Sequence, residues 1–248
     1  MSENLFLLRQ KVILVTGASS GIGRETAIQC SRMGAVLIIT GRNPERLAQT
    51  LSQLEGTGHQ MLIADLTKDL NNITDLVPIV DGVVHSAGIL SLSPFNHLPE
   101  DELHNIMNVN FFSPVFLTQQ LLKNKKINKN GSIVFISSLA GNVIASKGNS
   151  AYSASKSAIS GIVKVLALEQ ASRRIRVNCI LPGMVQTELM GSFLSSLTPE
   201  QLAEDEKKYP LGYGRPQDVA NAAIYLLSDA SRWMTGASLV LDGGFSIQ

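Results

Sequence analysis

The sequence predicts an α/β fold in one domain: a doubly wound, seven-stranded parallel sheet with helices on both faces. Two observations predict it. Short continuous apolar runs, typical of strands buried on both faces, alternate with helix-like segments from end to end. A glycine-rich turn also follows the first run directly, at the place where open α/β sheets bind ligands. Right-handed crossovers between successive strands would then cover both faces of the sheet with helices.

The expected elements follow this alternation in chain order. The first run, Val12-Ile-Leu-Val15, ends in Thr16-Gly17, as a strand buried on both faces would. Further strands of this kind are expected at residues 36–40, 61–64, 82–85, 133–137, 177–180 and 238–241. Helices are expected at residues 22–33, 44–54, 100–123, 152–170 and 217–228. No linker or repeat divides the chain, so residues 1–248 are expected to form one domain.

The composition limits the class of protein. Of 248 residues, 44% are hydrophobic and 17% are charged, and the net charge is +1. These values describe a well-filled globular core and argue against nucleic acid or an anionic membrane as a partner. No apolar run approaches a membrane span, and Cys30 and Cys179 suit a reducing compartment as buried small side chains. The four histidines show no metal-ligand spacing. We therefore expect a cytoplasmic protein without a metal site.

A phosphate-binding turn is predicted at Thr16-Gly-Ala-Ser-Ser-Gly-Ile-Gly23, between the first strand and the first helix. Gly17 would allow the sharp turn, Gly21 the approach of a diphosphate to the backbone, and Gly23 the close packing of helix on strand. The helix N-terminus would offer free N–H groups and a partial positive charge to the phosphates. The alternative is a glycine-rich turn without a chemical role.

The end of the second strand, Thr40-Gly-Arg-Asn43, bears on the choice of cofactor. A site for NAD typically has an acid there to hold the ribose 2′-hydroxyl, and this chain has Arg42 instead. Because a guanidinium matches a 2′-phosphate, the sequence favours NADP(H) over NAD(H). The alternative is that Arg42 faces solvent at a loop.

Tyr152 and Lys156 are four residues apart, which places both side chains on one face if the segment is helical. A cation beside a tyrosine stabilises the phenolate and so lowers the pKa of the phenol, which suits proton exchange near neutral pH. Taken by itself, the pair could also be part of a solvated helix face.

Together these motifs resemble the short-chain dehydrogenase/reductase family over almost the whole chain. The resemblance rests on Thr16-Gly-x-x-x-Gly-Ile-Gly23, Tyr152-x-x-x-Lys156, His85-Ser-Ala-Gly88, Asn108-Val-Asn110, Ile136-Ser-Ser138, Leu181-Pro-Gly-Met-Val-Gln-Thr187 and Asp242-Gly-Gly244. It implies a Rossmann-type fold and an oxidoreductase that reduces a ketone or a 3-oxoacyl group to an alcohol. In general pattern, the chain is most similar to 3-oxoacyl-(acyl-carrier-protein) reductases.

The resemblance also implies roles for individual residues. Tyr152 would exchange a proton with the substrate oxygen, Lys156 would lower the Tyr152 pKa and hold the nicotinamide ribose, and Ser138 would hydrogen-bond the substrate oxygen. Asn110 would order a water that links the lysine to solvent. The cofactor contacts that it implies are Gly17, Ser19, Ser20, Gly21, Ile22, Gly23, Arg42, Asp65, Leu66, Ala87, Gly88, Tyr152, Lys156, Pro182, Gly183, Val185 and Thr187.

Pro114 bears on the role of Asn110. It lies inside the helix expected at residues 100–123 and has no N–H to bond the carbonyl four residues earlier, which belongs to Asn110. That carbonyl would then be free to bind water. The alternative is that Pro114 kinks the helix, and both can hold.

Three departures from the family pattern lead to further expectations. Ser86 replaces an asparagine that usually braces the central strands, so the support there must differ. The neighbouring His85 is expected to be a strand-end histidine and not a catalytic base. The short stretch between Asp65 and Gly82 predicts a shortened fourth helix beside the adenine pocket.

The third departure is in the loop before Tyr152. Ser138 and Tyr152 are 14 positions apart, one more than the family pattern, so a residue is expected to be added in the loop at 141–149. Ser137 is the alternative to Ser138 as the substrate-binding serine.

Residues 187–210 are expected to close over the substrate, by the same resemblance. An apolar face of Leu189, Met190, Phe193, Leu194 and Leu197 could line a site for a lipophilic ketone, or could instead pack on the core or a subunit. The resemblance further implies a homodimer or homotetramer, paired through the helices at 100–123 and 152–170. Other functions remain open: a cofactor-binding sensor or scaffold without turnover, or an NAD-dependent alcohol, sugar or steroid dehydrogenase.

Overall fold

The centre of the molecule is a parallel β-sheet, and a computed structural model describes residues 4–194 and 198–247 of the chain. The strands are β1 (Val12–Thr16), β2 (Val36–Gly41), β3 (Gln60–Ile63), β4 (Val80–His85), β5 (Ile127–Ile136), β6 (Arg176–Pro182) and β7 (Ser238–Leu241). They form one seven-stranded sheet in the order β3-β2-β1-β4-β5-β6-β7, with every neighbouring pair parallel. The predicted doubly wound parallel sheet is therefore confirmed.

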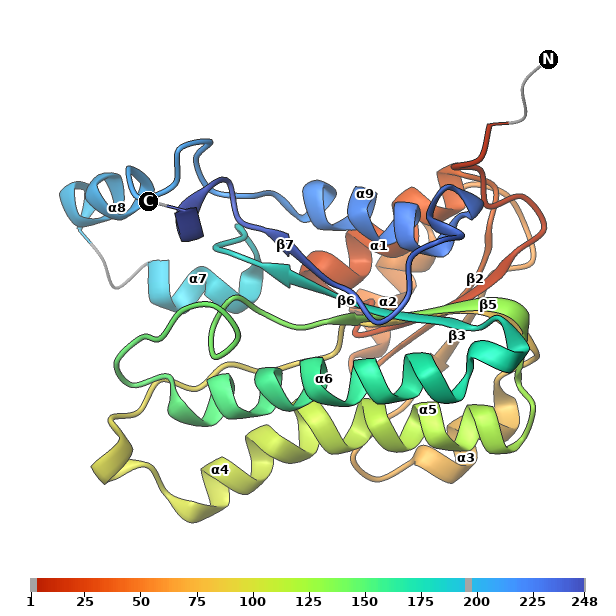
Figure 1. Ribbon diagram of the computed structural model, residues 1–248, viewed down its shortest axis with the longest axis horizontal. Coiled ribbons are helices and arrows are strands. Elements are labelled where there is room, and N and C mark those ends of the chain that lie inside the picture. The colour runs from red at the N-terminus through yellow and green to blue at the C-terminus, as the bar shows by residue number, and fades with distance from the viewer. Residues whose placement is uncertain (1–3, 195–197, 248) are drawn as a thin grey trace.

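Helices cover both faces of this sheet (Figure 1). They are α1 (Gly21–Arg32), α2 (Pro44–Leu51), α3 (Leu70–Leu76), α4 (Glu100–Met107), α5 (Ser113–Lys123), α6 (Ser150–Glu169), α7 (Glu188–Leu194), α8 (Pro199–Glu206) and α9 (Pro216–Leu227). The helices α3 to α6 lie on one face, and α1, α2 and α9 lie on the other (Figure 1). Both α7 and α8 lie beyond the carboxyl ends of the strands (Figure 1).

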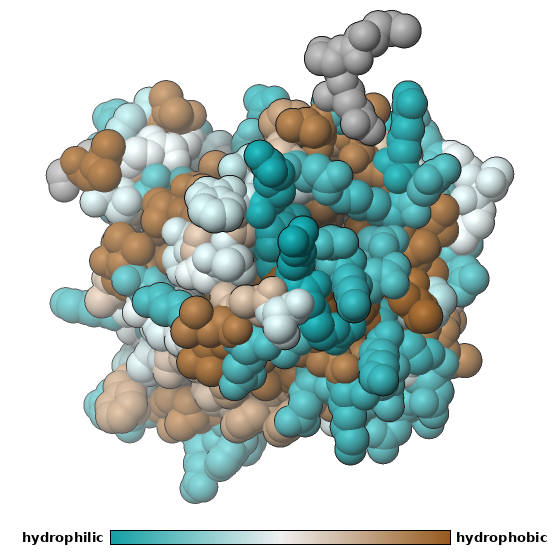
Figure 2. Space-filling model, turned by 45° about the vertical axis from the view of Figure 1, so that its right-hand side comes forward, coloured by the Kyte–Doolittle hydropathy of each residue, from teal (hydrophilic) through white to brown (hydrophobic). Residues whose placement is uncertain are grey.

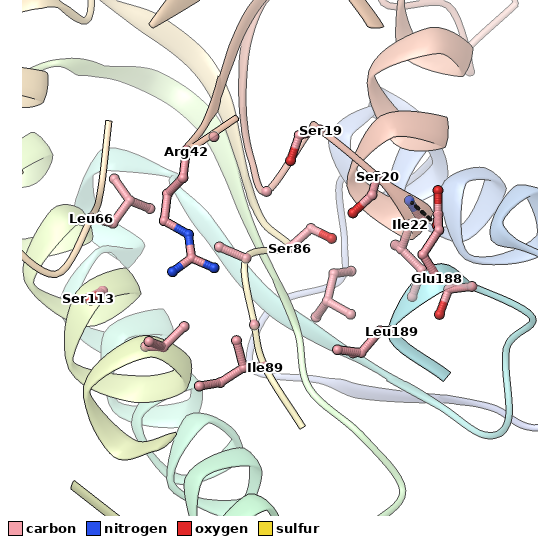
Figure 3. A pocket seen from close by; sticks show the side chains of 18 of the residues that line it. Ser19, Ser20, Ile22, Arg42, Leu66, Ser86, Ile89, Ser113, Glu188 and Leu189 are labelled. Atoms are coloured by element: carbon pink, nitrogen blue, oxygen red, sulfur yellow. Dashed lines mark hydrogen bonds between the residues drawn. The ribbon is translucent and has the colours of Figure 1, made fainter. Parts of the chain in front are cut away.

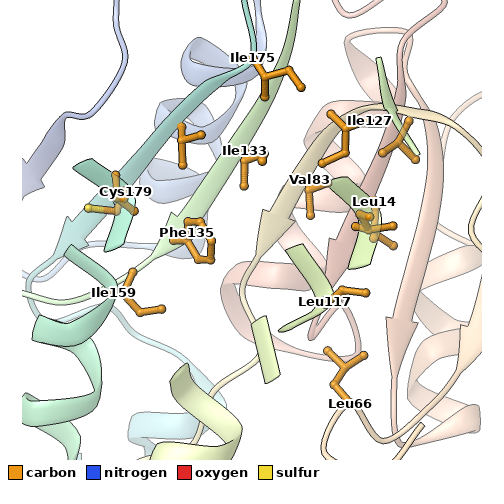
Figure 4. Packing of buried hydrophobic residues seen from close by; sticks show 14 of the residues in the cluster. Leu14, Leu66, Val83, Leu117, Ile127, Ile133, Phe135, Ile159, Ile175 and Cys179 are labelled. Carbon is orange, nitrogen blue, oxygen red and sulfur yellow. The ribbon is translucent and has the colours of Figure 1, made fainter. Parts of the chain in front are cut away.

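Two buried apolar layers hold the helices on the sheet. In β1, Leu14 belongs to the layer under α5 and α6, whereas Ile13 and Val15 belong to the layer under α1 and α9. Successive strand residues point to opposite faces, so a strand that is covered on both sides needs an unbroken apolar run. Phe135 and Leu117, both buried, lie in the first layer, which Figure 4 shows from close by. Each large apolar side chain buried in this way contributes about 1.5–3 kcal/mol to folding.

The strand β5 is longer than predicted. It begins at Ile127 and not at residue 133, and its residues 128–130 are exposed, so no apolar pattern indicated them. The register with β4 shifts between Val80 and Gly82, and Asn130 has a φ of 63° in the polar stretch. The extension is therefore an irregular start of the strand, in which the buried Ile127 precedes three exposed polar residues.

The helix expected at residues 100–123 is present, and a π turn divides it into α4 and α5. Between α4 and α5, residues Asn108–Phe112 form a wide π turn. The N–H of Ser113 reaches back to the carbonyl of Asn108, and the Ser113 hydroxyl donates to the same oxygen at 2.7 Å. Because Pro114 has no N–H, the helical hydrogen bonds are interrupted here, and the chain fits an additional residue into the turn.

The helix α3, in the stretch where a shortened helix was expected, has seven residues and is the third helix in chain order, not the fourth. The helix α2 ends at Leu51 and not at residue 54, because a turn in which the Gln53 N–H bonds the Thr50 carbonyl follows it.

The segment expected to close over the substrate contains α7 and α8. The latter begins with a capping box in which Thr198 and Gln201 each bond the other's backbone N–H. Of the five apolar residues expected to form one face here, Leu197 lies outside the described residues, and so do the side chains of Phe193 and Leu194.

The surface is mixed in character. Figure 2 shows a face on which hydrophilic side chains dominate the centre, with apolar ones scattered among them. Across residues 4–194 and 198–247, none of the helices combines the length and the apolar character that crossing a membrane would need.

Candidate active site

The turn between β1 and α1 depends on glycine at two positions. Gly17 has a φ of +66°, and a Cβ there would lie 2.7 Å from backbone atoms of Ala87. At Gly23, a Cβ would lie 2.3 Å from the Gly17 carbonyl oxygen. Neither distance is possible for a real side chain, so the turn packs against the loop after β4 and against α1 as the sequence predicted.

A cavity of about 380 Å³ opens at the carboxyl ends of the strands, beside this turn. It lies where the strand order reverses, because β1 and β4 are neighbours in the sheet. The predicted residues that line it are Gly17, Ser19, Ser20, Gly21, Ile22, Arg42, Asp65, Leu66, Ala87, Gly88, Ser138, Tyr152, Lys156, Pro182, Gly183, Val185 and Thr187. Tertiary structure thus brings together nearly all of the predicted site; Gly23 and Asn110 lie behind its wall.

One end of the cavity carries positive charge. Arg42 extends from the end of β2 into the cavity, between Leu66 and Ser86 (Figure 3). Arg46, from the first turn of α2, lines the same end, and its backbone N–H is capped by the Asn43 side chain at 2.8 Å. Arg46 was not among the residues predicted from the sequence. Its position in the first turn of a helix that begins at a proline was the signal that could have found it.

Asp65 lies close to these cations. Partial burial works to raise the pKa of its carboxyl, but hydrogen bonds from Thr67 and the charges of Arg42 and Lys68 bring the pKa below its usual value. The carboxylate accepts from the Thr67 N–H at 3.0 Å and from the Thr67 hydroxyl at 2.8 Å. Nearby in the lining, the Thr40 hydroxyl is buried and has no hydrogen-bond partner among the described residues.

At the other end, α6 presents Tyr152 and Lys156 on one face, as their spacing predicted. The Lys156 Nζ lies 5.7 Å from the centroid of the Tyr152 ring and donates a hydrogen bond to the Ile136 carbonyl at 2.8 Å. Tyr152 also shares a side-chain hydrogen bond with Ser138. An acid, a cation and a hydroxyl therefore converge on one wall of the cavity.

The pKa values of this pair correct one expectation. The sequence predicted that Lys156 lowers the Tyr152 pKa. In the structure, burial raises the Tyr152 pKa, and the hydrogen bond with Ser138 offsets part of that rise. Burial lowers the pKa of Lys156 to about 8. Desolvation disfavours both charged forms. It therefore favours the neutral phenol of Tyr152 and the neutral amine of Lys156 more than the spacing alone suggested.

The two neighbouring serines are distinguished by their partners. Ser137 is buried, and its hydroxyl donates to the Lys156 carbonyl at 2.8 Å. The Ser138 hydroxyl accepts from the Ala140 N–H at 3.1 Å and faces Tyr152. The geometry therefore favours Ser138 over Ser137 as the partner of Tyr152.

Asn110 lies in the π turn and is 2% exposed. Its side chain accepts from the Ile89 N–H at 2.8 Å, donates to the Ile89 carbonyl at 3.0 Å, and donates to the Ser155 hydroxyl at 3.1 Å. It therefore fixes Ile89, which lines the cavity, against the start of α6. Pro114, four residues further on, has no N–H that could bond the Asn110 carbonyl.

With Ser86 in place of the asparagine of the family pattern, Thr16 supports the central strands. Its hydroxyl lies 3.2 Å from the Ser86 N–H and 3.3 Å from the Ala87 N–H. His85 is buried against the Phe135 ring with centroids 4.7 Å apart, and burial lowers its pKa to about 3. The ring bonds the Thr118 hydroxyl at 2.8 Å. His85 is thus a neutral strand-end histidine behind the cavity wall.

The lining fits a dinucleotide. The turn at Gly17 comes close to the backbone after β4, and α1 begins at Gly21, which lines the cavity. The cations at one end suit a phosphate, and the Tyr152 wall at the other end suits a reacting group. Within residues 4–194 and 198–247, no group of His, Cys, Asp and Glu side chains is placed to hold a metal ion.

Comparisons with known proteins agree with this geometry. A family model described as enoyl-(acyl carrier protein) reductase matches residues 17–246. The 3-oxoacyl-[acyl-carrier-protein] reductase FabG of Chlamydia trachomatis is 34% identical over 97% of this chain and 99% of its own length. The oxidoreductase YciK of Escherichia coli, itself uncharacterised, is 37% identical over 93% of this chain and 91% of its own.

Solved structures show the same fold. A short-chain type dehydrogenase/reductase from Mycobacterium marinum is 31% identical, with a TM-score of 0.87 over 98% of each chain. A chain from Beutenbergia cavernae, provisionally named an NAD(P) dependent gluconate 5-dehydrogenase, holds NADP at low occupancy. It is 29% identical, with a TM-score of 0.89 over 99% of this chain and 100% of its own.

The fold and the site define a short-chain oxidoreductase. The family model covers most of the chain, and the relatives match it almost from end to end. The chain belongs to the short-chain dehydrogenase/reductase family, as the resemblance of its motifs implied.

Proposed function

We propose that this protein is an NADP(H)-dependent oxidoreductase that reduces a ketone or 3-oxoacyl group to an alcohol. The observation that carries the proposal is the convergence of Ser138, Tyr152 and Lys156 on the cavity that Arg42 enters from its other end. A cationic end and a hydroxyl wall in one cavity suit an extended cofactor that carries a 2′-phosphate at one end and a reacting ring at the other.

In this mechanism the bound nicotinamide supplies the hydride. Ser138 holds the carbonyl oxygen of the substrate by a hydrogen bond and polarises it. Tyr152 then gives its phenolic proton to the oxygen as negative charge develops there, and takes a proton from the alcohol in the reverse direction. Because burial raises the Tyr152 pKa, the residue is protonated and ready to act as the acid at neutral pH.

Lys156 and Asn110 support this proton transfer. Lys156, with its Nζ 5.7 Å from the Tyr152 ring centroid, lines the cavity beside Tyr152, where it would hold the nicotinamide ribose. Asn110 holds Ile89 and the start of α6 in place through its three side-chain hydrogen bonds. Its backbone carbonyl is the proposed contact for a water that returns the proton.

The cofactor preference follows from the cationic end. Arg42 and Arg46 both line it, and their positive charges would attract the negative charge of a 2′-phosphate. Replacing Arg42 by Asp would repel that phosphate and accept a bond from a ribose 2′-hydroxyl. We therefore expect Arg42→Asp to shift the preference from NADPH towards NADH; an unchanged ratio of kcat/KM values would contradict this role.

The substrate end favours a lipophilic carbonyl compound. Ile89, Leu189 and Met190 contribute apolar side chains to the lining there. An acyl chain would bury apolar area against them. The relatives named 3-oxoacyl-[acyl-carrier-protein] reductase support an acyl substrate. A sugar acid, the substrate class in the name of the Beutenbergia relative, would need polar partners for many hydroxyl groups.

The decisive experiment is a panel of ketones, 3-oxoacyl thioesters and sugar acids with NADPH and with NADH, followed by the absorbance of the nicotinamide. Tyr152→Phe should abolish turnover and leave NADPH binding largely intact. Tyr225→Phe, on α9 and outside the cavity lining, is the matched control. Undiminished turnover in Tyr152→Phe would refute the mechanism. Tight cofactor binding without turnover of any compound would favour a sensor or scaffold.

A further inference from the structure

Glu188 is the first residue of α7 and reaches across to the glycine-rich turn. Its Oε2 accepts a hydrogen bond from the Gly21 N–H at 3.0 Å, and its Oε1 lies 3.3 Å from a guanidinium nitrogen of Arg24. Figure 3 shows the carboxylate beside Ser20 and Ile22, with the bond to Gly21 as a dashed line. The sequence pattern gave no signal for this contact, because Gly21 and Glu188 are 167 positions apart.

This carboxylate occupies a place suited to a phosphate. Gly21 begins α1, a helix of 12 residues. Its N–H is therefore one of the donors that have no partner within the helix, at the positive end of the helix dipole. These are the donors that a dinucleotide uses to hold its diphosphate in an open α/β sheet. One N–H cannot serve both anions fully, and two anions at one helix end repel each other.

Arg24 holds the carboxylate in this position. Besides its contact with Glu188, its guanidinium donates to the Ser19 carbonyl of the same turn. Its Nε is buried and has no hydrogen-bond partner among the described residues. Glu188 itself is about half exposed, so it can swing into solvent without breaking the core.

We propose that Glu188 competes with the diphosphate of the cofactor for the N-terminus of α1. Cofactor binding breaks the contact with Gly21, frees the start of α7, and so couples cofactor entry to movement of the segment that borders the substrate end. The inference rests on the proposed use of a dinucleotide. It adds a residue that sets the affinity for the cofactor and links that affinity to the substrate side.

The expected change in cofactor affinity follows from the Glu188 contacts that the cofactor must break. A carboxylate at a helix N-terminus and an exposed ion pair are each weak, and together they correspond to about a tenfold change in an equilibrium constant. Glu188→Gln keeps the shape and can still accept from Gly21, but removes the charge. We therefore expect this variant to bind NADPH about tenfold more tightly than the native protein.

The test is calorimetric titration of the full chain with NADPH, NADH and adenosine 2′-monophosphate. NADPH and NADH carry the diphosphate, whereas the monophosphate has no phosphate at the 5′ position. Glu188→Gln should tighten binding of both dinucleotides and leave the monophosphate unchanged. Glu200→Gln removes the same charge from α8, where the side chain is fully exposed, and is the matched control. Thermal unfolding verifies that both variants are folded.

Each contrary result would overturn the inference. Equal or weaker dinucleotide binding in Glu188→Gln would show that Glu188 does not compete. Equal tightening of the monophosphate, or the same change in Glu200→Gln, would show a general effect of charge. Failure of the native protein to bind either dinucleotide would refute the proposed function as well, so the two failures can be told apart.

Discussion

The pH dependence of stability at Lys156 tests the desolvation of the active site without a substrate. The Lys156 side chain is 6% exposed, and burial lowers its pKa from 10.5 to about 8. We expect Lys156→Met, which keeps a long side chain and removes the charge, to abolish turnover and to change how the free energy of unfolding depends on pH.

The direction of the change follows from the protonation states. Below pH 8 lysine is protonated in both the folded and the unfolded protein, so the cost of burying its charge is fully present. Between pH 8 and 10.5 the folded protein has lost that proton and the unfolded chain has kept it, so stability gained from this residue rises with pH. The full difference corresponds to about 3 kcal/mol, of which about 2 kcal/mol should appear between pH 7 and pH 10. The variant lacks this gain.

The assay is urea unfolding of both proteins at pH 7, 8.5 and 10, followed by circular dichroism. The stability of Lys156→Met relative to the native protein should fall by about 2 kcal/mol over this range. Lys164→Met, at an exposed position of the same helix, serves as the control and should follow the native curve. Parallel curves for Lys156→Met and the native protein would refute the argument that the Lys156 ammonium is desolvated.

Three further perturbations test other parts of the structure. Gly17→Ala should destabilise the fold by about 2 kcal/mol or more and abolish cofactor binding, because its φ is +66° and a Cβ would meet Ala87 at 2.7 Å; unfolding and titration would measure both. Ser138→Ala should lower kcat about 100-fold with little change in stability. Ser137→Ala should instead lower the free energy of unfolding by about 1–2 kcal/mol, because its bond to the Lys156 carbonyl is lost. The opposite pattern would reverse the roles of the two serines. Leu168 on α6 is 80% exposed, and Leu168→Glu should convert the proposed homo-oligomer to a monomer in light scattering, an outcome that an already monomeric native protein would rule out.

Much of the fold could be predicted because the sheet is buried on both faces. Each strand then needs an apolar run, as in Val12 to Val15, and such runs are visible without an alignment. The glycine turn could also be predicted, because backbone geometry restricts Gly17 and Gly23 to one residue type. The exposed residues 128–130 of β5 and the π turn before Pro114 could not, because no apolar pattern marks them.

The candidate site divides in the same way. Tyr152 and Lys156 are neighbours on one helix, so their spacing was enough to place them on one face. Their pKa values were not predictable from spacing, because desolvation depends on everything that packs around them. The sequence left Ser137 and Ser138 as alternatives, and the hydrogen bond from Ser137 to the Lys156 carbonyl favours Ser138.

By itself, the sequence determined the parallel sheet and the glycine-rich turn, since local periodicity and residue-specific backbone geometry express these directly, and its motifs resembled the family to which the chain belongs. Tertiary structure decided which side chains from distant segments meet at the cavity. It brought Arg46 beside Arg42 and placed the Glu188 carboxylate on the Gly21 N–H, a contact between residues 167 positions apart. Contacts of this kind arise from the folding of the chain as a whole, and no local pattern records them.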